Sequence, residues 1–578
     1  MRPITKRIAN IPALVMGLLS LWACGREAGP EADLIIANGV IYTVHAGQPQ
    51  AEALAIKDDT LLAVGPAEEV AAYRGPQTEV IDLEGRFAMP GFIEGHGHFS
   101  GLGLSLIELN FLGVESWQKI LGMVADQAVQ TPSGAWIVGR GWHQEKWTVE
   151  PQHSLNGYPH HRSLSELTPE HPVMLIHASG HSLFANEKAM ELAGVSEETA
   201  DPAGGEIVRD ATGKPTGVFE ERAMGLIREA YQQYQNSLGE AQRKAQWQKG
   251  IALAQKECLA KGITSFQDAG SKFYELDAYR EMAERGELDL RLWAMVRHSA
   301  DAMRGKLADY RWIGLGNDHL TVRAIKSEVD GALGAYGAWL LEPYNDKPGF
   351  VGQNTTPLKE VERIAGLAVA HDMQLCVHAI GDRANRLVLD LFERSFEQHG
   401  PGKDRRWRVE HAQHLAASDI ERMARLNAIA SMQAIHCTSD APFVVKRLGE
   451  ERAREGAYAW RSLLDAGAVV TNGTDAPVED VDPIASFYAS VTRRRPDNGL
   501  VFFPEQAMTR QEALYSYTMA NAYAAFEEDL KGSLEPGKLA DLVVLSQNLL
   551  TCPEEDILKT RVDMTFVGGE LKYSRVQK

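Results

Sequence analysis

The chain has 578 residues, of which 44% are hydrophobic and 24% are charged. These values exclude a wholly disordered chain, a collagen-like repeat and a membrane protein with many spans. The 59 basic and 78 acidic residues give a net charge of −19, which makes the chain a poor partner for nucleic acid or for an anionic membrane surface. The length predicts roughly two to four domains.

Residues 1–23 have the pattern of a secretion signal. Three basic residues precede an apolar run over residues 8–23, which is shorter than the roughly 20 residues of a membrane-spanning helix. The run ends in Leu21-Trp22-Ala23-Cys24, which resembles the lipobox of bacterial lipoproteins. The resemblance implies cleavage before Cys24, acylation of that cysteine and tethering of an exported body in the bacterial cell envelope, in the periplasm or at the outer membrane. Ordinary signal cleavage and an uncleaved anchor helix are the alternatives, and residues 24–31 are expected to form a short tether.

Short strands and turns are predicted near both ends of the chain. Residues 32–44 (ADLIIANGVIYTV) are split by Asn38-Gly39, a hairpin turn signal. Near the other end, DMTFVGGELKYS has two glycines at the expected turn. Each piece is too small to bury a core alone. We therefore expect residues 32–90 and 528–578 to form one composite β-sandwich domain.

The region between them, residues 91–527, alternates strand-like and helical runs. Strand-like examples are HPVMLIHAS, ITSFQDAG, LTVRAIKSEVDG and MQLCVHAIGD, and TPLKEVERIAGLAVAHD is helical. This alternation predicts an α/β fold, and a TIM-like (β/α)₈ barrel is favoured over an open sheet because no GxGxxG-type loop follows any strand. The stretch from about residue 103 to 250 is rich in helix and loop signals and is expected to form an insertion in the barrel.

Histidines and one aspartate stand where the predicted strands end. His96 and His98 are two residues apart in an extended segment, so both rings point to the same side of the chain. Such a pair alone is more typical of chance or of core histidines than of a metal site. His378, His411 and Asp475 close three further strand-like runs, at the barrel face where active sites lie. Together these residues indicate a site for a divalent metal.

The motifs together resemble the amidohydrolase superfamily, and most closely its amidohydrolase family 3 branch, with the YtcJ-like proteins and N-substituted formamide deformylases. The resemblance runs from Ala32 to the C-terminus and rests on GFIEGHGHF, VHAIGDRAN, VEHAQH, SMQAIH, NGTDAP and GSLEPGKLADLVVLS. It implies two metals, usually zinc, with His96 and His98 on the first and His378 and His411 on the second. It also implies a carboxylated bridging lysine at Lys326, and a metal-binding, proton-shuttling aspartate at Asp475.

Lys326 has a second interpretation. A lysine ammonium beside two dications is repelled, so it serves only as a neutral amine or as a carbamate formed with CO₂. Ser327, Glu328 and Val329 stand where the family usually has apolar residues. Glu328 shares a strand face with Lys326, and it could neutralise the lysine in an ion pair or replace it as a ligand. Loss of the carbamate would leave one metal per chain instead of two.

The resemblance also points to residues near the substrate. His181 and His436 match family histidines, and either could polarise a carbonyl as a neutral hydrogen-bond donor. A satisfied structural histidine is the alternative for each. Glu94 stands where the family commonly has aspartate, and only a shifted contact behind the ligands is expected there.

The sequence therefore predicts a metal-dependent hydrolase of amide or other carbon–nitrogen bonds outside peptides, with Asp475 moving the proton. An N-formyl or N-acyl substrate is implied by the resemblance alone. The alternatives are a dipeptidase, a cyclic-amide or ester hydrolase, a one-metal isomerase or deaminase, and an inactive tethered binding protein. The expected partner is a small-molecule substrate, with no nucleic acid and with membrane contact only through a lipid at Cys24. Homo-oligomer formation is left open.

Overall fold

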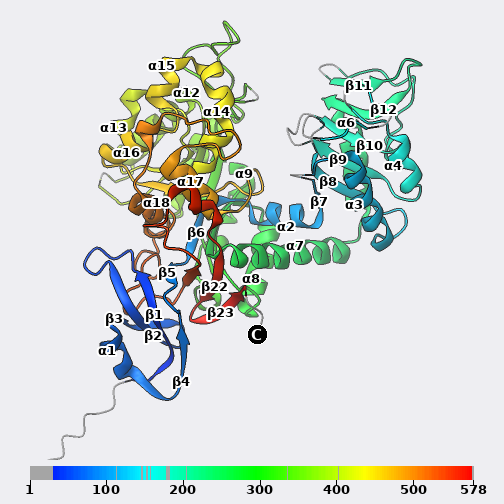
Figure 1. Ribbon diagram of the computed structural model, residues 1–578. Coiled ribbons are helices and arrows are strands. Elements are labelled where there is room, and N and C mark those ends of the chain that lie inside the picture. Colours follow the sequence, from blue (N-terminus) through cyan, green and yellow to red (C-terminus); the bar gives the residue numbers. More distant parts are fainter. Residues whose placement is uncertain are drawn as a thin grey trace, which may run out of the picture.

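The computed structural model describes residues 30–575 except 112–113, 143, 145–146, 152–153, 156–157, 178–181, 203–204, 335 and 401 (Figure 1). The predicted signal, Cys24 and most of the tether lie outside the described residues. Among the residues that are described, no helix combines the length and the apolar character needed to cross a membrane.

Eight parallel strands form a barrel, which confirms the predicted (β/α)₈ fold. In spatial order they are β6 (Phe92–Gly97), β13 (Ile263–Ser271), β14 (Arg291–Val296), β16 (Leu320–Glu328), β17 (Gln374–Ala379), β18 (Arg408–His411), β19 (Ile429–Met432) and β20 (Val470–Asn472). Beyond β20, the Asp475 amide donates to the His96 carbonyl across 2.7 Å, and the Thr474 amide donates to Glu94 Oε1 across 2.6 Å. These two bonds join the last strand to the first at the end of the barrel that carries the candidate ligands.

Helices surround the barrel because each presents one apolar face to the strands. In α12 (Asp382–Gln398), Ala384, Val388 and Phe392 are buried at helical spacing. The other helices of this part are α7 (Glu240–Ala260), α8 (Phe273–Glu284), α9 (Ala300–Met303), α10 (Leu315–Asp318), α11 (Leu358–Ala370), α13 (Ala417–Arg425), α14 (Ala434–Leu448), α15 (Glu450–Gly456), α16 (Trp460–Asp465), α17 (Pro483–Thr492), α18 (Arg510–Ser516) and α19 (Met519–Ala524), and the short strand β15 (Trp312–Gly314) pairs with β16.

Both chain ends contribute to one eight-stranded sheet beside the barrel (Figure 1). Its N-terminal strands are β1 (Ala32–Tyr42), β2 (Gln50–Lys57), β3 (Thr60–Gly65), β4 (Arg74–Asp82) and β5 (Phe87–Pro90), with α1 (Ala67–Val70) between β3 and β4. Its C-terminal strands are β21 (Leu542–Leu545), β22 (Val562–Val567) and β23 (Glu570–Ser574). Strand β21 pairs antiparallel with β5, so neither end completes the sheet without the other. The hydrogen-bonded strands form a single sheet, and the domain boundaries given above stay a prediction.

The hairpin predicted at Asn38-Gly39 is wrong. Strand β1 runs through both residues, and its pairing with β2 shifts register between Ala37 and Ile41. Asn38 takes a φ of 57°, and a Cβ on Gly39 would lie 2.4 Å from a methyl carbon of Leu83. An Asn-Gly pair suits a bulge as well as a turn because both need a positive φ and a close backbone approach.

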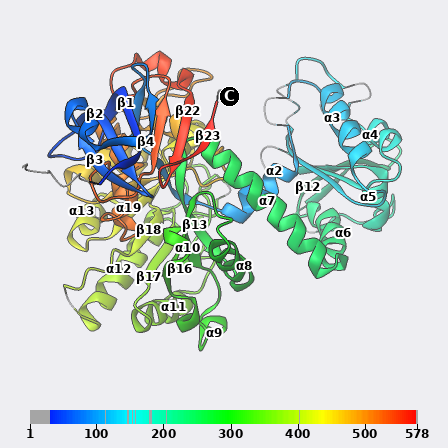
Figure 2. The same cartoon turned by 90° about the horizontal axis from the view of Figure 1, so that it is seen from below.

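A separate six-stranded sheet lies beside the barrel, linked to it by α2 (Phe99–Ile107) and α7 (Figure 2). Its strands are β7 (Leu109–Asn110), β8 (Ile137–Trp142), β9 (Val173–His177), β10 (Ser182–Ala185), β11 (Gly205–Arg209) and β12 (Pro215–Glu221), and its helices are α3 (Trp117–Gln130), α4 (Arg162–Leu167), α5 (Glu187–Leu192) and α6 (Met224–Ser237). A Cβ on Gly103 of α2 would lie 2.5 Å from the Gly250 backbone of α7, so glycine permits the two helices to touch.

This second sheet corrects two expectations. The region is not mainly helix and loop, and HPVMLIHAS supplies β9 of this sheet instead of a barrel strand. Its apolar residues fit any buried strand, and only the tertiary pairing of β9 with β8 and β10 decides to which sheet it belongs.

Candidate active site

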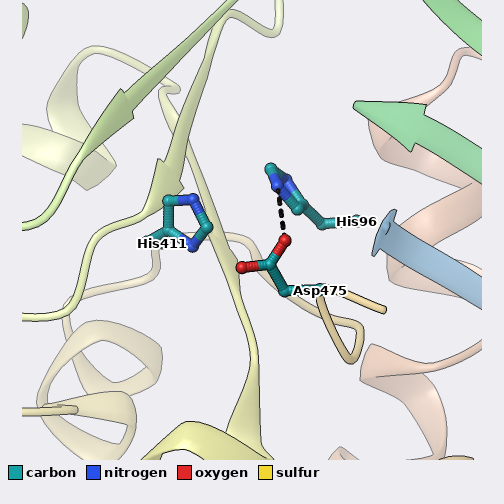
Figure 3. Close-up of side chains that lie close together, drawn as sticks. All are labelled: His96, His411 and Asp475. Atoms are coloured by element: carbon teal, nitrogen blue, oxygen red, sulfur yellow. Dashed lines mark ion pairs between the residues drawn. The ribbon is translucent and has the colours of Figure 1, made fainter. Parts of the chain in front are cut away.

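Three of the predicted ligands meet at the carboxyl end of the barrel. His96 lies in β6, His411 ends β18, and Asp475 follows β20. One potential ligand atom from each lies within 4.8 Å of the others, and all three residues are buried (Figure 3). The ring of His378 in β17 has its centre 4.4 Å from that of His411, and the ring of His98 is centred 5.7 Å from that of His96. All five residues therefore gather at one place.

Asp475 contacts three of the histidines. Its Oδ1 lies 3.1 Å from His98 Nε2 and 3.6 Å from His96 Nε2, and its Oδ2 lies 3.5 Å from His436 Nε2. His411 and Asp475 both have a left-handed backbone, with φ of 73° and 58°. This conformation costs about 1–3 kcal/mol for a residue other than glycine. The barrel imposes this backbone conformation at the ends of β18 and β20, where the side chains of His411 and Asp475 turn toward the centre of the cluster.

Glu410 orients His96. The buried carboxylate of Glu410 accepts a hydrogen bond from His96 Nδ1, and it pairs with the buried guanidinium of Arg408 at 2.7 Å. A proton on Nδ1 leaves the lone pair of Nε2 available, and this buried nitrogen has no hydrogen-bond partner in the described structure. Glu410 was not predicted from the sequence, although two charged residues two positions apart in the apolar strand WRVEH were a signal of an inward-facing pair.

Gln433 does the same for His411. The Gln433 amide nitrogen donates to the Ser431 carbonyl at 3.0 Å, which turns its Oε1 toward His411 Nδ1 at 2.7 Å. The proton of His411 is thereby held on Nδ1, and Nε2 is free to bind a metal. Oriented imidazoles of this kind are the usual arrangement behind metal-binding histidines. Gln433 also was missed, and its position just after β19 gave no separate signal.

The protonation states suit a divalent cation. Burial lowers the pKa of His96 to about 4, and it also lowers the pKa of His378 and of His411. Burial opposes ionisation of Asp475, but hydrogen bonds from His436 and His98 hold its pKa well below the ordinary value. The cluster thus offers neutral imidazoles and a carboxylate, the donors that zinc and similar ions bind. The buried Nε2 atoms of His96 and His378 have no hydrogen-bond partner in the described part of the chain, so the cluster fits a metal ion.

Lys326 is buried in β16, and burial lowers its pKa, which favours the neutral amine. The alternative of a Lys326–Glu328 ion pair is wrong. Glu328 instead accepts a hydrogen bond from Arg297 at the end of β14, and its side chain is 37% exposed while Lys326 is buried. The two residues share a strand face, but Glu328 stands at the open rim, where the arginine reaches it and the lysine does not.

The three other residues singled out in the sequence are His436, His181 and Glu94. His436 lies in α14 with Nε2 near Asp475 and Nδ1 3.5 Å from Glu479 Oε1. Burial opposes its protonation, but these two carboxylates raise the pKa of His436 well above its ordinary value. His181 lies outside the described residues. Glu94 is fully buried behind the ligands, and burial raises its pKa to about 8.

A parallel barrel with buried histidines and an aspartate converging at its carboxyl end defines a metal-dependent hydrolase. A family model described as "Amidohydrolase family" matches residues 79–573. The chain belongs to the amidohydrolase family.

Similar proteins span nearly the whole chain. This chain is 32% identical to the protein LONG AFTER FAR-RED 3 of Arabidopsis thaliana, in an alignment that covers 94% of this chain and 92% of that protein. It is 31% identical to the putative amidohydrolase YtcJ of Bacillus subtilis (93% and 99% covered) and 29% identical to the N-substituted formamide deformylase of Arthrobacter pascens (94% and 98%). A crystal structure of an uncharacterized metal-dependent hydrolase from Pyrococcus horikoshii matches with a TM-score of 0.72 and 26% identity, over 90% of this chain and 99% of that one.

Proposed function

We propose that the protein hydrolyses carbon–nitrogen bonds of N-formyl or other N-acyl amines. The observation that carries the proposal is the convergence of His96, His411 and Asp475, with two further histidines beside them, at the carboxyl end of the barrel. The similarity to a protein named N-substituted formamide deformylase, over 94% of the chain, supports the bond type.

The proposed cofactor is a divalent metal, with zinc the first candidate. His96, His98, His378, His411 and Asp475 would hold it, and a carboxylated Lys326 would bridge two ions if two are bound. Such an ion supplies Lewis acidity, which makes water a stronger acid and polarises a carbonyl oxygen. The neutral state favoured for buried Lys326 is the state that reacts with CO₂.

The proposed roles of the chain's own residues follow from their contacts. Asp475 is ionised and faces the centre of the cluster, so it accepts the proton of the attacking water and later passes it to the leaving amine. His436 holds Asp475 from the other side, with its Nε2 3.5 Å from Asp475 Oδ2 and its Nδ1 3.5 Å from Glu479 Oε1. Its raised pKa favours the imidazolium over the neutral donor expected from the sequence, so its proposed role is to keep Asp475 ionised. His181 is proposed, on sequence grounds, as the hydrogen-bond donor to the developing oxyanion.

A substrate panel tests this function. Metal-loaded protein is expected to release amine from N-formyl and N-acyl amines, and Asp475→Asn is expected to abolish that release while leaving the fold intact. Turnover confined to esters, cyclic amides, dipeptides or aminopurines would assign a different reaction to the same site. Binding of these compounds without turnover by the metal-loaded wild type would favour a binding protein.

We also propose that the protein is exported and held at a membrane of the cell envelope through a lipid on Cys24. The lipobox-like sequence before Cys24 supports this proposal. Cys24→Ser is expected to release the body from the membrane fraction or to leave it unprocessed. A variant with the same membrane association and processed size as the wild type would contradict the lipid anchor.

A further inference from the structure

A half-exposed ion pair lies at the mouth of the barrel, beside the candidate metal site. Arg297 follows β14, and its Nη2 donates to the carboxylate of Glu328 at the end of β16. The two side chains are 39% and 37% exposed. In the parallel pairing of β16 and β17, Glu328 stands directly beside His378. The pair is therefore one strand away from a proposed metal ligand.

Arg297 reaches this place across the ends of three neighbouring strands. A Cβ built on Gly270 of β13, which has a φ of +128°, would lie 2.6 Å from Arg297 Cδ. The absence of a side chain at Gly270 lets the arginine stem rest on the end of β13 while its guanidinium extends to β16.

The guanidinium has unused donors. Nη2 donates to Glu328, and the Arg297 guanidinium makes no other hydrogen bond among the described residues. A guanidinium presents five N–H groups in a planar fork that matches a carboxylate in a two-bond arrangement. Because this fork is partly open to solvent, a ligand in the mouth can occupy the donors that Glu328 leaves free.

The surrounding rim is basic in a chain that is acidic overall. Lys272 Nζ donates to the Arg297 carbonyl at 2.9 Å, and Lys306 Nζ lies 5.6 Å from the ring centre of Phe273, at the start of α8. The carboxylate of Glu275 accepts a hydrogen bond from the Lys272 amide at 2.7 Å. A local positive field of this kind attracts anions to the mouth.

We propose that Arg297 is a specificity residue that binds a carboxylate carried by the substrate near its scissile C–N bond, and that Glu328 competes with this carboxylate for the guanidinium. The inference rests on the proposed amide hydrolysis and adds the charge of the substrate to it. The favoured substrates are N-formyl or N-acyl amines that bear a carboxylate, as opposed to neutral alkyl or aryl amides.

The test uses two substrates that differ only in the anion: N-formyl-leucine, and N-formyl-isoamylamine, which lacks the carboxylate. Arg297→Gln is expected to raise KM for N-formyl-leucine by about 10- to 100-fold, the usual loss for a hydrogen bond to a charged group. Glu328→Gln is expected to lower the same KM by about threefold, because it removes the competing charge. Both variants should leave KM for the neutral substrate within about twofold of the wild type.

Opposite effects of the two partners are the result that a merely structural ion pair would not give. The matched control is the half-exposed pair Arg280–Glu284 on α8, in which Arg280→Gln and Glu284→Gln should change neither KM. Equal losses on both substrates from Arg297→Gln and Glu328→Gln would overturn the proposal. If neither substrate turns over, the proposed hydrolysis fails separately. Binding of N-formyl-leucine to metal-loaded wild type and Arg297→Gln, measured by calorimetry, still decides the role of Arg297, because equal affinities would refute it.

Discussion

Buried polar groups lie at both ends of the barrel, and the two ends differ in how completely the hydrogen bonds of those groups are made. At the amino end, Arg291 of β14 donates two hydrogen bonds to Asp541, at 2.7 and 3.0 Å. Its remaining nitrogen donates to the Asn317 carbonyl, and Asp541 also accepts from the Gly568 amide. At the carboxyl end, the buried Nε2 atoms of His96 and His378 have no hydrogen-bond partner in the described structure.

The difference separates a structural role from a ligand site. A buried charge whose hydrogen bonds are all made holds two parts of the fold together, here the barrel and the sheet of the chain ends. Buried nitrogen lone pairs that converge without hydrogen-bond partners fit the coordination of a metal ion. Convergence is essential to this argument, because His414 also has two buried unpartnered nitrogens and yet belongs to no cluster of possible ligands among the described residues.

The largest effect is expected at the carboxyl end, from Asp475→Asn. The amide keeps the shape of the side chain but cannot accept the proton, so kcat for amide hydrolysis should fall by about 10³- to 10⁴-fold. The melting temperature should change little, because the bond that joins the last strand to the first uses the Asp475 backbone amide, which the substitution keeps. Activity assays and thermal unfolding of the same preparation check both expectations. A variant that retains a tenth of the wild-type kcat would remove Asp475 from the chemistry.

At the amino end, Asp541→Asn is expected to act on stability alone. Arg291 would be left as a buried cation without its counter-charge, which costs about 3–5 kcal/mol of unfolding free energy. Metal content per folded chain should not change. Replacing both partners, as Arg291→Met with Asp541→Leu, should recover most of the loss. Denaturant unfolding measures these differences, and an Asp541→Asn protein as stable as the wild type would show that the pair does not hold the two parts together.

A smaller effect is expected from Gln433→Leu, which removes the acceptor that orients His411. Loss of such a contact typically costs about 10- to 100-fold in metal affinity. Gln506→Leu is the matched control, since Gln506 is also a buried glutamine but bonds Ser462 away from the cluster. Competition with a chelator gives the metal affinity of each variant. Equal affinities for the two variants would mean that Gln433 plays no part in holding a metal.

The smallest expected effect is a pH dependence of stability from the amino end. Burial disfavours the charged form of Asp541, but the Arg291 guanidinium and the Gly568 amide outweigh it and hold the pKa of Asp541 below its ordinary value. Because an unfolded aspartate has a pKa of about 3.9, this contribution is complete above about pH 4 and is lost as the pH falls through the folded-state pKa. Unfolding free energies of the wild type should therefore fall more steeply below pH 4 than those of the double Arg291→Met, Asp541→Leu variant. Parallel curves would contradict this assignment.

Much of this molecule could be predicted from local sequence. The alternation of strands and helices predicts the barrel, and residues at strand ends predict its candidate ligands, because the carboxyl ends of parallel strands must lie on one face. The six-stranded sheet between β6 and β13 could not be predicted in this way. A buried apolar run such as β9 predicts a strand, but it does not say whether that strand belongs to the barrel or to a second sheet.

The residues that orient the candidate ligands also could not be predicted from the sequence. The role of Glu410 depends on its contact with His96, 314 residues away in the sequence, and the role of Gln433 depends on its contact with His411 on another strand. The partner of Glu328 could not be predicted for the same reason. Because Lys326 and Glu328 share a strand face, the sequence suggested Lys326 as the partner of Glu328. The side chain that reaches Glu328 is instead that of Arg297, which follows the neighbouring strand β14.

Metal analysis of the purified protein tests the central claim most directly. Elemental analysis of the wild type should find one or two divalent ions per chain, and the double variant His96→Ala, His411→Ala should lose them while remaining folded by circular dichroism. His171→Leu, which replaces a buried histidine just before β9 of the second sheet, should keep the full metal content. Equal metal content in the His96→Ala, His411→Ala variant and the wild type would contradict the assignment of the carboxyl end of the barrel as the metal centre.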